Sequence, residues 1–126
     1  MHNSGPCDPF RLGYKLKQGI DLDWRKSGKT YKDALDEAFN ILENKYGAKR
    51  SDFEVTDWGH TKDDKTIPVE YRSGNLEANI DYSHSTEGTL AAPHVGYLNK
   101  TKGNKMVGHI ILDEVPSGRI SKKKYE

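Results

Sequence analysis

Three histidines, His84, His94 and His109, lie in or beside short runs in the second half of the chain that alternate polar and apolar residues. Histidine can serve as either an acid or a base because its unperturbed pKa lies near neutrality. Glu70 and Asp81 occupy neighbouring runs of the same kind, where a carboxylate can orient an imidazole or act as the base itself. These residue types suit the proton transfers of general acid–base catalysis.

Cleavage of an RNA phosphodiester is one reaction that these histidines and carboxylates could catalyse. The reaction needs a base for the 2′-hydroxyl, an acid for the leaving 5′-oxygen and a cation beside the phosphate, and it needs no metal or other cofactor. The sequence offers Arg72 for the cationic role, together with Lys102 and Lys105 from a glycine-containing turn. His94 is the foremost acid–base candidate, because the preceding Pro93 imposes an extended approach to it.

A metal-dependent DNase is the competing enzymatic interpretation. Four carboxylates could supply oxygen ligands to a divalent ion. They are Asp63, Asp64, Glu70 and Asp81. The letters "EYR" (70–72) have a loose likeness to a Glu-x-Lys nuclease signature. Three histidines could also bind zinc, but their spacing matches no compact zinc motif.

Each candidate also has an ordinary structural interpretation, because a polar strand face is commonly a solvated surface. His84 can cap the rim of the core, and His109 can be a half-buried structural residue because it shares strand parity with Ile111. His60 precedes a charged loop and is typical of a turn. On these interpretations the domain is a non-enzymatic binding module whose polar face docks a protein.

Composition limits the remaining possibilities. The 126 residues are 33% hydrophobic and carry a net charge of +1, which predicts one domain with a small core. A nucleic-acid surface would therefore require the basic residues to gather on one face. Cys7 is the only cysteine, so an internal disulfide and a cysteine-based metal knuckle are excluded. No apolar run approaches the length of a membrane span, and no signal peptide is visible. The letters "SGKT" (27–30) resemble the end of a phosphate-binding loop but lack its upstream glycine.

The elements that must position these residues follow from the periodicity. Residues 31–46 place apolar side chains at helical spacing, between an N-cap at Thr30 and a terminal Gly47. After the helix the period changes to two, which predicts strands at 53–58, 66–72, 76–84, 94–98 and 106–115, with a hairpin loop at 100–105. We expect an α+β domain in which this N-terminal helix packs on a four- to five-stranded antiparallel sheet and leaves the other face for a ligand.

We expect this domain to span 29–118, between an irregular lead-in at 1–28 and a basic tail at 119–126.

Four segments carry a resemblance to a known family. They are "GKTYKDALDEAF", "FEVTDWG", "PVEYRSGNLEANIDYSH" and "PHVGYLNKTKGNKMVGHIILDEVP". Over roughly residues 22–118 the chain resembles the C-terminal toxin domains of bacterial polymorphic toxins, and in particular polymorphic toxin type 47. In the family pattern the "PHVG" and "GHI" strands match His94 and His109, and the histidine after "NID" matches His84. Members often carry a glycine- and arginine-rich turn between the last two strands, where this chain has lysines.

The resemblance implies a nuclease, an RNase by expectation, with a fold similar to the barnase, EndoU, colicin E5/D and RelE group. It also implies secretion as part of a larger effector, action in the cytoplasm of a competing bacterium, and a cognate immunity protein as partner. Because Lys100, Lys102 and Lys105 lie in one hairpin, we expect that inhibitor to be acidic.

Overall fold

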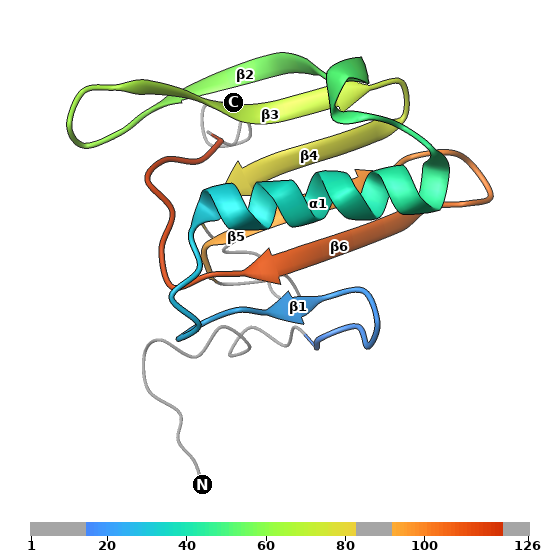
Figure 1. The fold of residues 1–126 in the computed structure, drawn as a ribbon, viewed down its shortest axis with the longest axis horizontal. Coiled ribbons are helices and arrows are strands. Elements are labelled where there is room, and N and C mark those ends of the chain that lie inside the picture. The colour runs from blue at the N-terminus through green and yellow to red at the C-terminus, as the bar shows by residue number, and fades with distance from the viewer. Residues whose placement is uncertain (1–14, 83–91, 120–126) are drawn as a thin grey trace, which may run out of the picture.

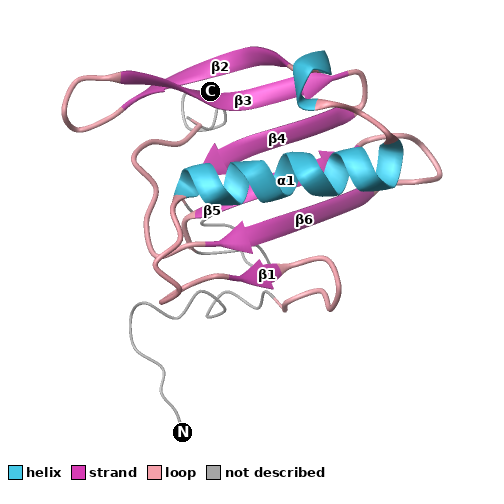
Figure 2. Cartoon of the chain, in the orientation of Figure 1, coloured by secondary structure: helices cyan, strands magenta, loops and turns pink. Residues whose placement is uncertain are grey.

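The computed structural model describes residues 15–82 and 92–119, which form one helix lying across a six-stranded sheet (Figure 1). The strands are β1 (Leu22–Asp23), β2 (Glu54–His60), β3 (Thr66–Ser73), β4 (Leu76–Asp81), β5 (His94–Asn99) and β6 (Met106–Ile111). The helices are α1 (Tyr31–Tyr46) and the short 3-10 turn η1 (Arg50–Asp52). The sheet order is β1-β6-β5-β4-β3-β2, and only the β1–β6 pair among these strands is parallel (Figure 2).

Helix α1 begins and ends where the sequence predicted. The Thr30 hydroxyl accepts the Asp33 backbone N–H, and the Asp33 carboxylate accepts the Thr30 backbone N–H, which is a reciprocal capping box. Gly47 ends the helix at a φ of 77°, in the left-handed region where glycine is free of the usual steric penalty. The apolar stripe of α1 packs on the sheet, and its buried members are Ala34, Leu35, Ala38, Phe39 and Leu42.

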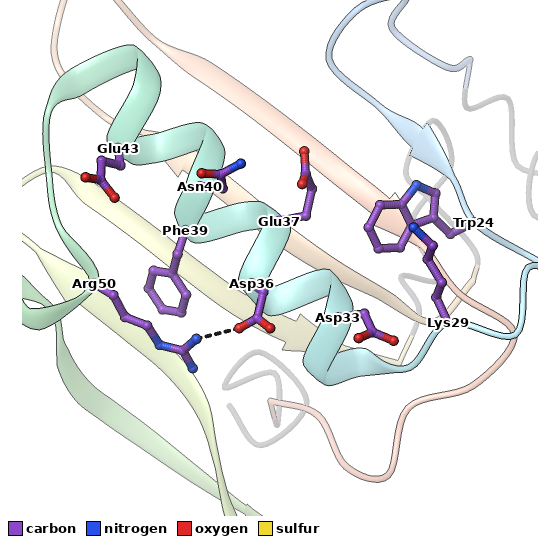
Figure 3. A pocket seen from close by; sticks show the side chains of 9 residues that line it. All are labelled: Trp24, Lys29, Asp33, Asp36, Glu37, Phe39, Asn40, Glu43 and Arg50. Carbon is purple, nitrogen blue, oxygen red and sulfur yellow. Dashed lines mark hydrogen bonds and ion pairs between the residues drawn. The ribbon is translucent and has the colours of Figure 1, made fainter.

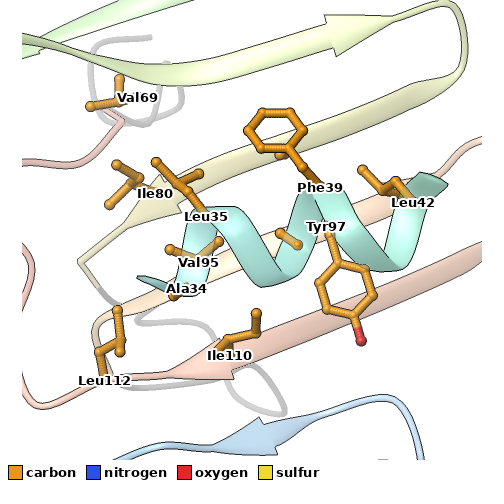
Figure 4. Close-up of a cluster of buried hydrophobic side chains, with 12 residues drawn as sticks. Ala34, Leu35, Phe39, Leu42, Val69, Ile80, Val95, Tyr97, Ile110 and Leu112 are labelled. Atoms are coloured by element: carbon orange, nitrogen blue, oxygen red, sulfur yellow. The ribbon is translucent and has the colours of Figure 1, made fainter. Parts of the chain in front are cut away.

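The core lies between α1 and one face of the sheet (Figure 4). Alternate residues of the central strands point into it, as the period of two predicted. They include Val69, Ala78, Ile80, Val95, Tyr97 and Ile110. The residues between them on β3, β4, β5 and β6 therefore project from the opposite face, which we call the polar face.

Two expectations about the sheet are wrong. It has six strands and is mixed, because Leu22–Asp23 forms a parallel edge strand inside the segment expected to be irregular. A two-residue strand is too short to leave a periodic signal. In addition, β4 ends at Asp81, inside the strand predicted for 76–84, and the next residue, Tyr82, is 49% exposed. The Ile80 carbonyl there accepts the Arg119 backbone N–H, so the chain after β6 returns to the end of β4.

Packing on the helix side also positions the turn before β1. Gly108 leaves room for the Tyr97 ring, since a Cβ at Gly108 would lie 2.3 Å from Tyr97 Cζ. The Tyr97 hydroxyl donates to the Ile20 carbonyl, and burial raises the pKa of this phenol to about 12. This contact places the next residue, Asp21, beside β6.

Candidate active site

The polar face brings His94 and His109 together from neighbouring strands. Gly96 pairs with His109 across β5 and β6, and His94 lies two residues before Gly96 on the same face. The two imidazole centroids are 5.0 Å apart, with the rings edge to face at 80°. Gly96 leaves space that the Asn79 carboxamide fills, because a Cβ at Gly96 would lie 2.6 Å from Asn79 Oδ1.

Asp21 orients His109. Its Oδ1 atom lies 3.1 Å from His109 Nδ1 and also accepts the His109 backbone N–H at 2.9 Å. Its Oδ2 atom accepts the Lys17 backbone N–H at 2.8 Å, so the carboxylate is held on both sides. With Nδ1–H directed at Asp21, His109 Nε2 is the atom left to accept a proton. Burial and the neighbouring His94 lower the pKa of His109 to about 4, although Asp21 opposes the shift.

His94 is the more deeply buried imidazole, with 1% of its surface exposed. Its Nδ1 lies 2.7 Å from the Ala92 carbonyl oxygen, and its Nε2 lies 3.7 Å from Asp81 Oδ2. Because Nδ1 faces a backbone acceptor, Nε2 is the nitrogen that can exchange a proton with another group. Asp81 faces this Nε2 atom of His94, whereas Asp21 contacts His109 at Nδ1.

Arg119 joins three carboxylates on the polar face. It donates from Nε and Nη2 to both oxygens of Asp81, each at 2.8 Å. It also donates from Nη1 to Glu70 and Glu77, each at 2.7 Å. Burial opposes ionisation of Asp81, but hydrogen bonds from Arg119 and His94 outweigh it and hold the pKa of Asp81 well below its usual range. Glu70 behaves similarly: burial is outweighed by Arg119 and Thr56, and its pKa is lowered.

The charges of this face form two layers. The carboxylate side chains of Glu77 and Asp81 are 3% and 10% exposed, so they lie beneath the surface. Arg72 and Lys100 are 47% and 51% exposed, and both reach the same buried atom, Glu77 Oε1, at 3.2 and 3.3 Å. The cations therefore form the outer layer and present positive charge to solvent.

The structure brings five of the sequence-predicted residues to this face. They are Glu70, Arg72, Asp81, His94 and His109. Lys102 and Lys105 instead lie at exposed positions in the loop between β5 and β6, beyond the ends of both strands. His84 and the basic tail after Arg119 lie outside the described residues.

Sequence reasoning missed three participants. Asp21 lies in the expected lead-in, and Arg119 lies in the expected tail, where neither has a periodic neighbourhood that would point to the sheet. Glu77 could have been found, because it shares strand parity with Asp81 on the predicted polar face. Its role depends on Arg119, and this contact spans 42 positions of sequence.

Two hollows elsewhere on the molecule have different chemistry. One, of about 630 Å³, lies on the outer side of α1 and includes Lys29 stacked on Trp24 and Arg50 paired with Asp36 (Figure 3). Its carboxylates outnumber its cations, which makes it unfavourable for a phosphodiester. The other, of about 690 Å³, lies between the start of α1 and the chain after β6 and is also mostly acidic among its charged residues. Within 15–82 and 92–119, no three His, Cys, Asp or Glu side chains are arranged to hold a metal ion.

The fold and the site define an α+β domain with a charged, histidine-bearing face on the side of the sheet away from its helix. Residues 11–119 match the family model described as bacterial toxin 47, Ntox47. The chain belongs to this family of bacterial polymorphic toxin domains, as the resemblance of its motifs predicted. Membership suggests a delivered effector. No curated protein and no solved structure matches the chain, and none of its described helices is long and apolar enough to cross a membrane.

Proposed function

We propose that this toxin domain is a nuclease that cleaves RNA on its polar face by acid–base catalysis without a metal ion. The observation that carries the proposal is the paired arrangement of Asp21 with His109 and of Asp81 with His94. Two imidazoles 5.0 Å apart, each with its own carboxylate, supply an acid and a base within reach of one phosphodiester.

In this mechanism His109 is the base. Its lowered pKa, about 4, keeps the ring neutral near pH 7, and Asp21 fixes Nδ1 so that Nε2 can accept a proton. His109 removes the proton of the 2′-hydroxyl, and the 2′-oxygen attacks phosphorus to form a cyclic phosphate. The bond from phosphorus to the 5′-oxygen breaks, and the protonated form of His94 gives its Nε2 proton to that oxygen. Because His94 is buried, the groups around it must move before the 5′-oxygen reaches Nε2.

The cations of the outer layer have the remaining role. Arg72 and Lys100 would hold a backbone phosphate of the RNA on the Glu77 side of the site, because each is anchored on one side by Glu77 and exposed on the other. Arg119 would act beneath them by keeping Asp81 ionised beside His94. Lys102 and Lys105 would contact a more distant part of the RNA strand.

The biological setting is part of the proposal. Family membership supports delivery of the domain as part of a larger secreted effector, action in the cytoplasm of a target bacterium, and neutralisation by a cognate immunity protein. An α1 helix packed on one face of a mostly antiparallel sheet is compatible with the barnase, EndoU, colicin E5/D and RelE group of folds.

Purified domain incubated with total RNA in EDTA tests the activity. We expect cleavage, strongly reduced in His109→Gln and His94→Gln and retained in His60→Gln. His60 is a suitable control because it is an exposed histidine at the end of β2, where its Nδ1 lies 3.4 Å from the Thr66 hydroxyl. Cleavage of plasmid DNA alone, and only with Mg²⁺, would identify a metal-dependent DNase. Intact RNA and DNA under both conditions would favour a binding module.

A further inference from the structure

Trp58 is a large aromatic side chain that the core does not use. It lies on β2 and is 56% exposed. Its strand partner is Pro68, which lies two residues from Glu70 on β3 and therefore on the same face. Thr56, two residues before Trp58, donates its hydroxyl to Glu70 at 2.7 Å. Trp58 is thus exposed on the polar face, next to the strand that contributes Glu70 and Arg72.

We propose that Trp58 is a stacking platform for a base of single-stranded RNA, beside the site where the strand is cut. This inference rests on the proposed function and adds a subsite to it. Indole rings bind bases of any sequence by stacking, and proteins that hold single strands combine such rings with a cationic track for the backbone.

The charges around Trp58 supply that track. Glu70 connects Thr56 to Arg119 through hydrogen bonds of 2.7 Å on each side. Arg72 follows Glu70 on the same strand face, four positions from Pro68, which is about 13 Å along a β-strand. The Glu70 side chain is 12% exposed, less than the Arg72 and Arg119 side chains that contact it, so an RNA strand passing over Glu70 would meet guanidinium groups before this carboxylate.

The backbone of β2 makes a strand from a partner protein a less suitable ligand at this edge of the sheet than RNA. Strand β2 is an edge of the sheet, but its register is irregular on both sides of Asp57. The Asp57 carboxylate accepts the Trp58 backbone N–H at 2.9 Å. The Trp58 backbone N–H therefore already has an acceptor. In addition, an edge strand that is irregular and charged is unfavourable for pairing with an added strand. The exposed indole itself remains the feature that a partner would contact.

Kinetics with single-stranded RNA test the subsite. Trp58→Ala is expected to raise KM about tenfold with little change in kcat, and Trp58→Phe is expected to restore most of the binding because a phenyl ring also stacks. Trp24→Phe is the matched control, since Trp24 lies against Lys29 on the helix side. An active enzyme whose KM is unchanged by Trp58→Ala would overturn this inference and leave the proposed function standing.

A second measurement does not depend on cleavage. The chain has two tryptophans, so in Trp24→Phe the tryptophan fluorescence comes from Trp58 alone. A 2′-O-methyl oligouridine, which lacks the attacking hydroxyl, is expected to quench it saturably, whether or not the domain proves to be an RNase. Absence of quenching would contradict the platform. So would loss of immunity-protein binding in Trp58→Ala with oligonucleotide binding intact, because Trp58 would then belong to a protein interface.

Discussion

The imidazoles of His94 on β5 and His109 on β6 lie with their centroids 5.0 Å apart and their ring planes at 80°. Two such rings resist being charged together, because each positive charge disfavours the other. Burial and this neighbour lower the pKa of His109 to about 4. His109 is therefore the ring that stays neutral near pH 7, which is the state that a general base requires.

Stability is expected to fall with acidification in a window that His109 sets. Its pKa is about 4 in the folded chain and about 6.5 when unfolded, so between these values the unfolded chain binds more protons. The free energy of unfolding should therefore fall as pH drops from about 6.5 to 4, by ~3 kcal/mol at most. Urea titrations at several pH values measure this slope.

The matched variant for that experiment is His109→Gln, which removes the titrating ring and should flatten the slope. Asp81 acts in a different pH window. Its pKa is lowered in the folded state, so its contribution to the free energy of unfolding is present above about pH 3.8 and is lost as the pH falls below that value. A slope between pH 6.5 and 4 that is equal in both proteins would show that His109 is not the responsible group.

Arg119 is expected to be a stability determinant despite its place near the end of the described chain. Arg119→Met would leave Asp81, Glu70 and Glu77 clustered without their shared guanidinium, at a cost of about 3–5 kcal/mol, which is typical when one member of a buried ion pair is removed. Chemical denaturation near pH 7 measures this loss in the free energy of unfolding. Lys65→Met is the control, since its ion pair with Asp63 is largely exposed and should leave the midpoint unchanged. Equal midpoints for the two variants would contradict this role.

Gly96 is expected to be required for the packing between Asn79 and His109. Gly96→Ala places a methyl group 2.6 Å from Asn79 Oδ1, and the Asn79 amide is tethered to Glu77 Oε2 at 2.6 Å. The overpacking should cost about 1–3 kcal/mol and lower the activity. Asn79→Ala removes the obstructing group, so adding Gly96→Ala to it should cost little. Additive effects in this double-mutant cycle would mean that the two side chains do not clash.

Local patterns were sufficient for much of this molecule. The capping box at Thr30 and the stripe of α1 predicted the helix, and alternation along β3 and β4 placed Glu70, Arg72 and Asp81 on one face. These features depend on neighbours within a few residues, which periodicity reads directly.

The rest depends on contacts between distant parts of the chain. Asp21 reaches His109 across 88 positions, and Arg119 reaches Glu70 across 49. Both lie in segments without periodicity, so nothing local distinguishes them from solvated charges. The lysines also illustrate a contact that the sequence does not reveal. Charge density along the sequence favoured Lys102 and Lys105, whereas Lys100 is the lysine that contacts the buried carboxylate of Glu77, at 3.3 Å.

That difference among the lysines leads to a prediction about substrate binding. Glu77 holds Arg72 and Lys100 on the polar face. Arg72→Gln and Lys100→Gln should therefore each raise KM for RNA severalfold, and this increase in KM should be greater at low salt. The double variant Lys102→Gln with Lys105→Gln removes two charges from the loop and should change KM less. Initial rates at two salt concentrations separate the cases. A larger effect from the loop pair would return the phosphate-binding role to the residues that the sequence first suggested, and would place the RNA strand nearer the hairpin than Glu77.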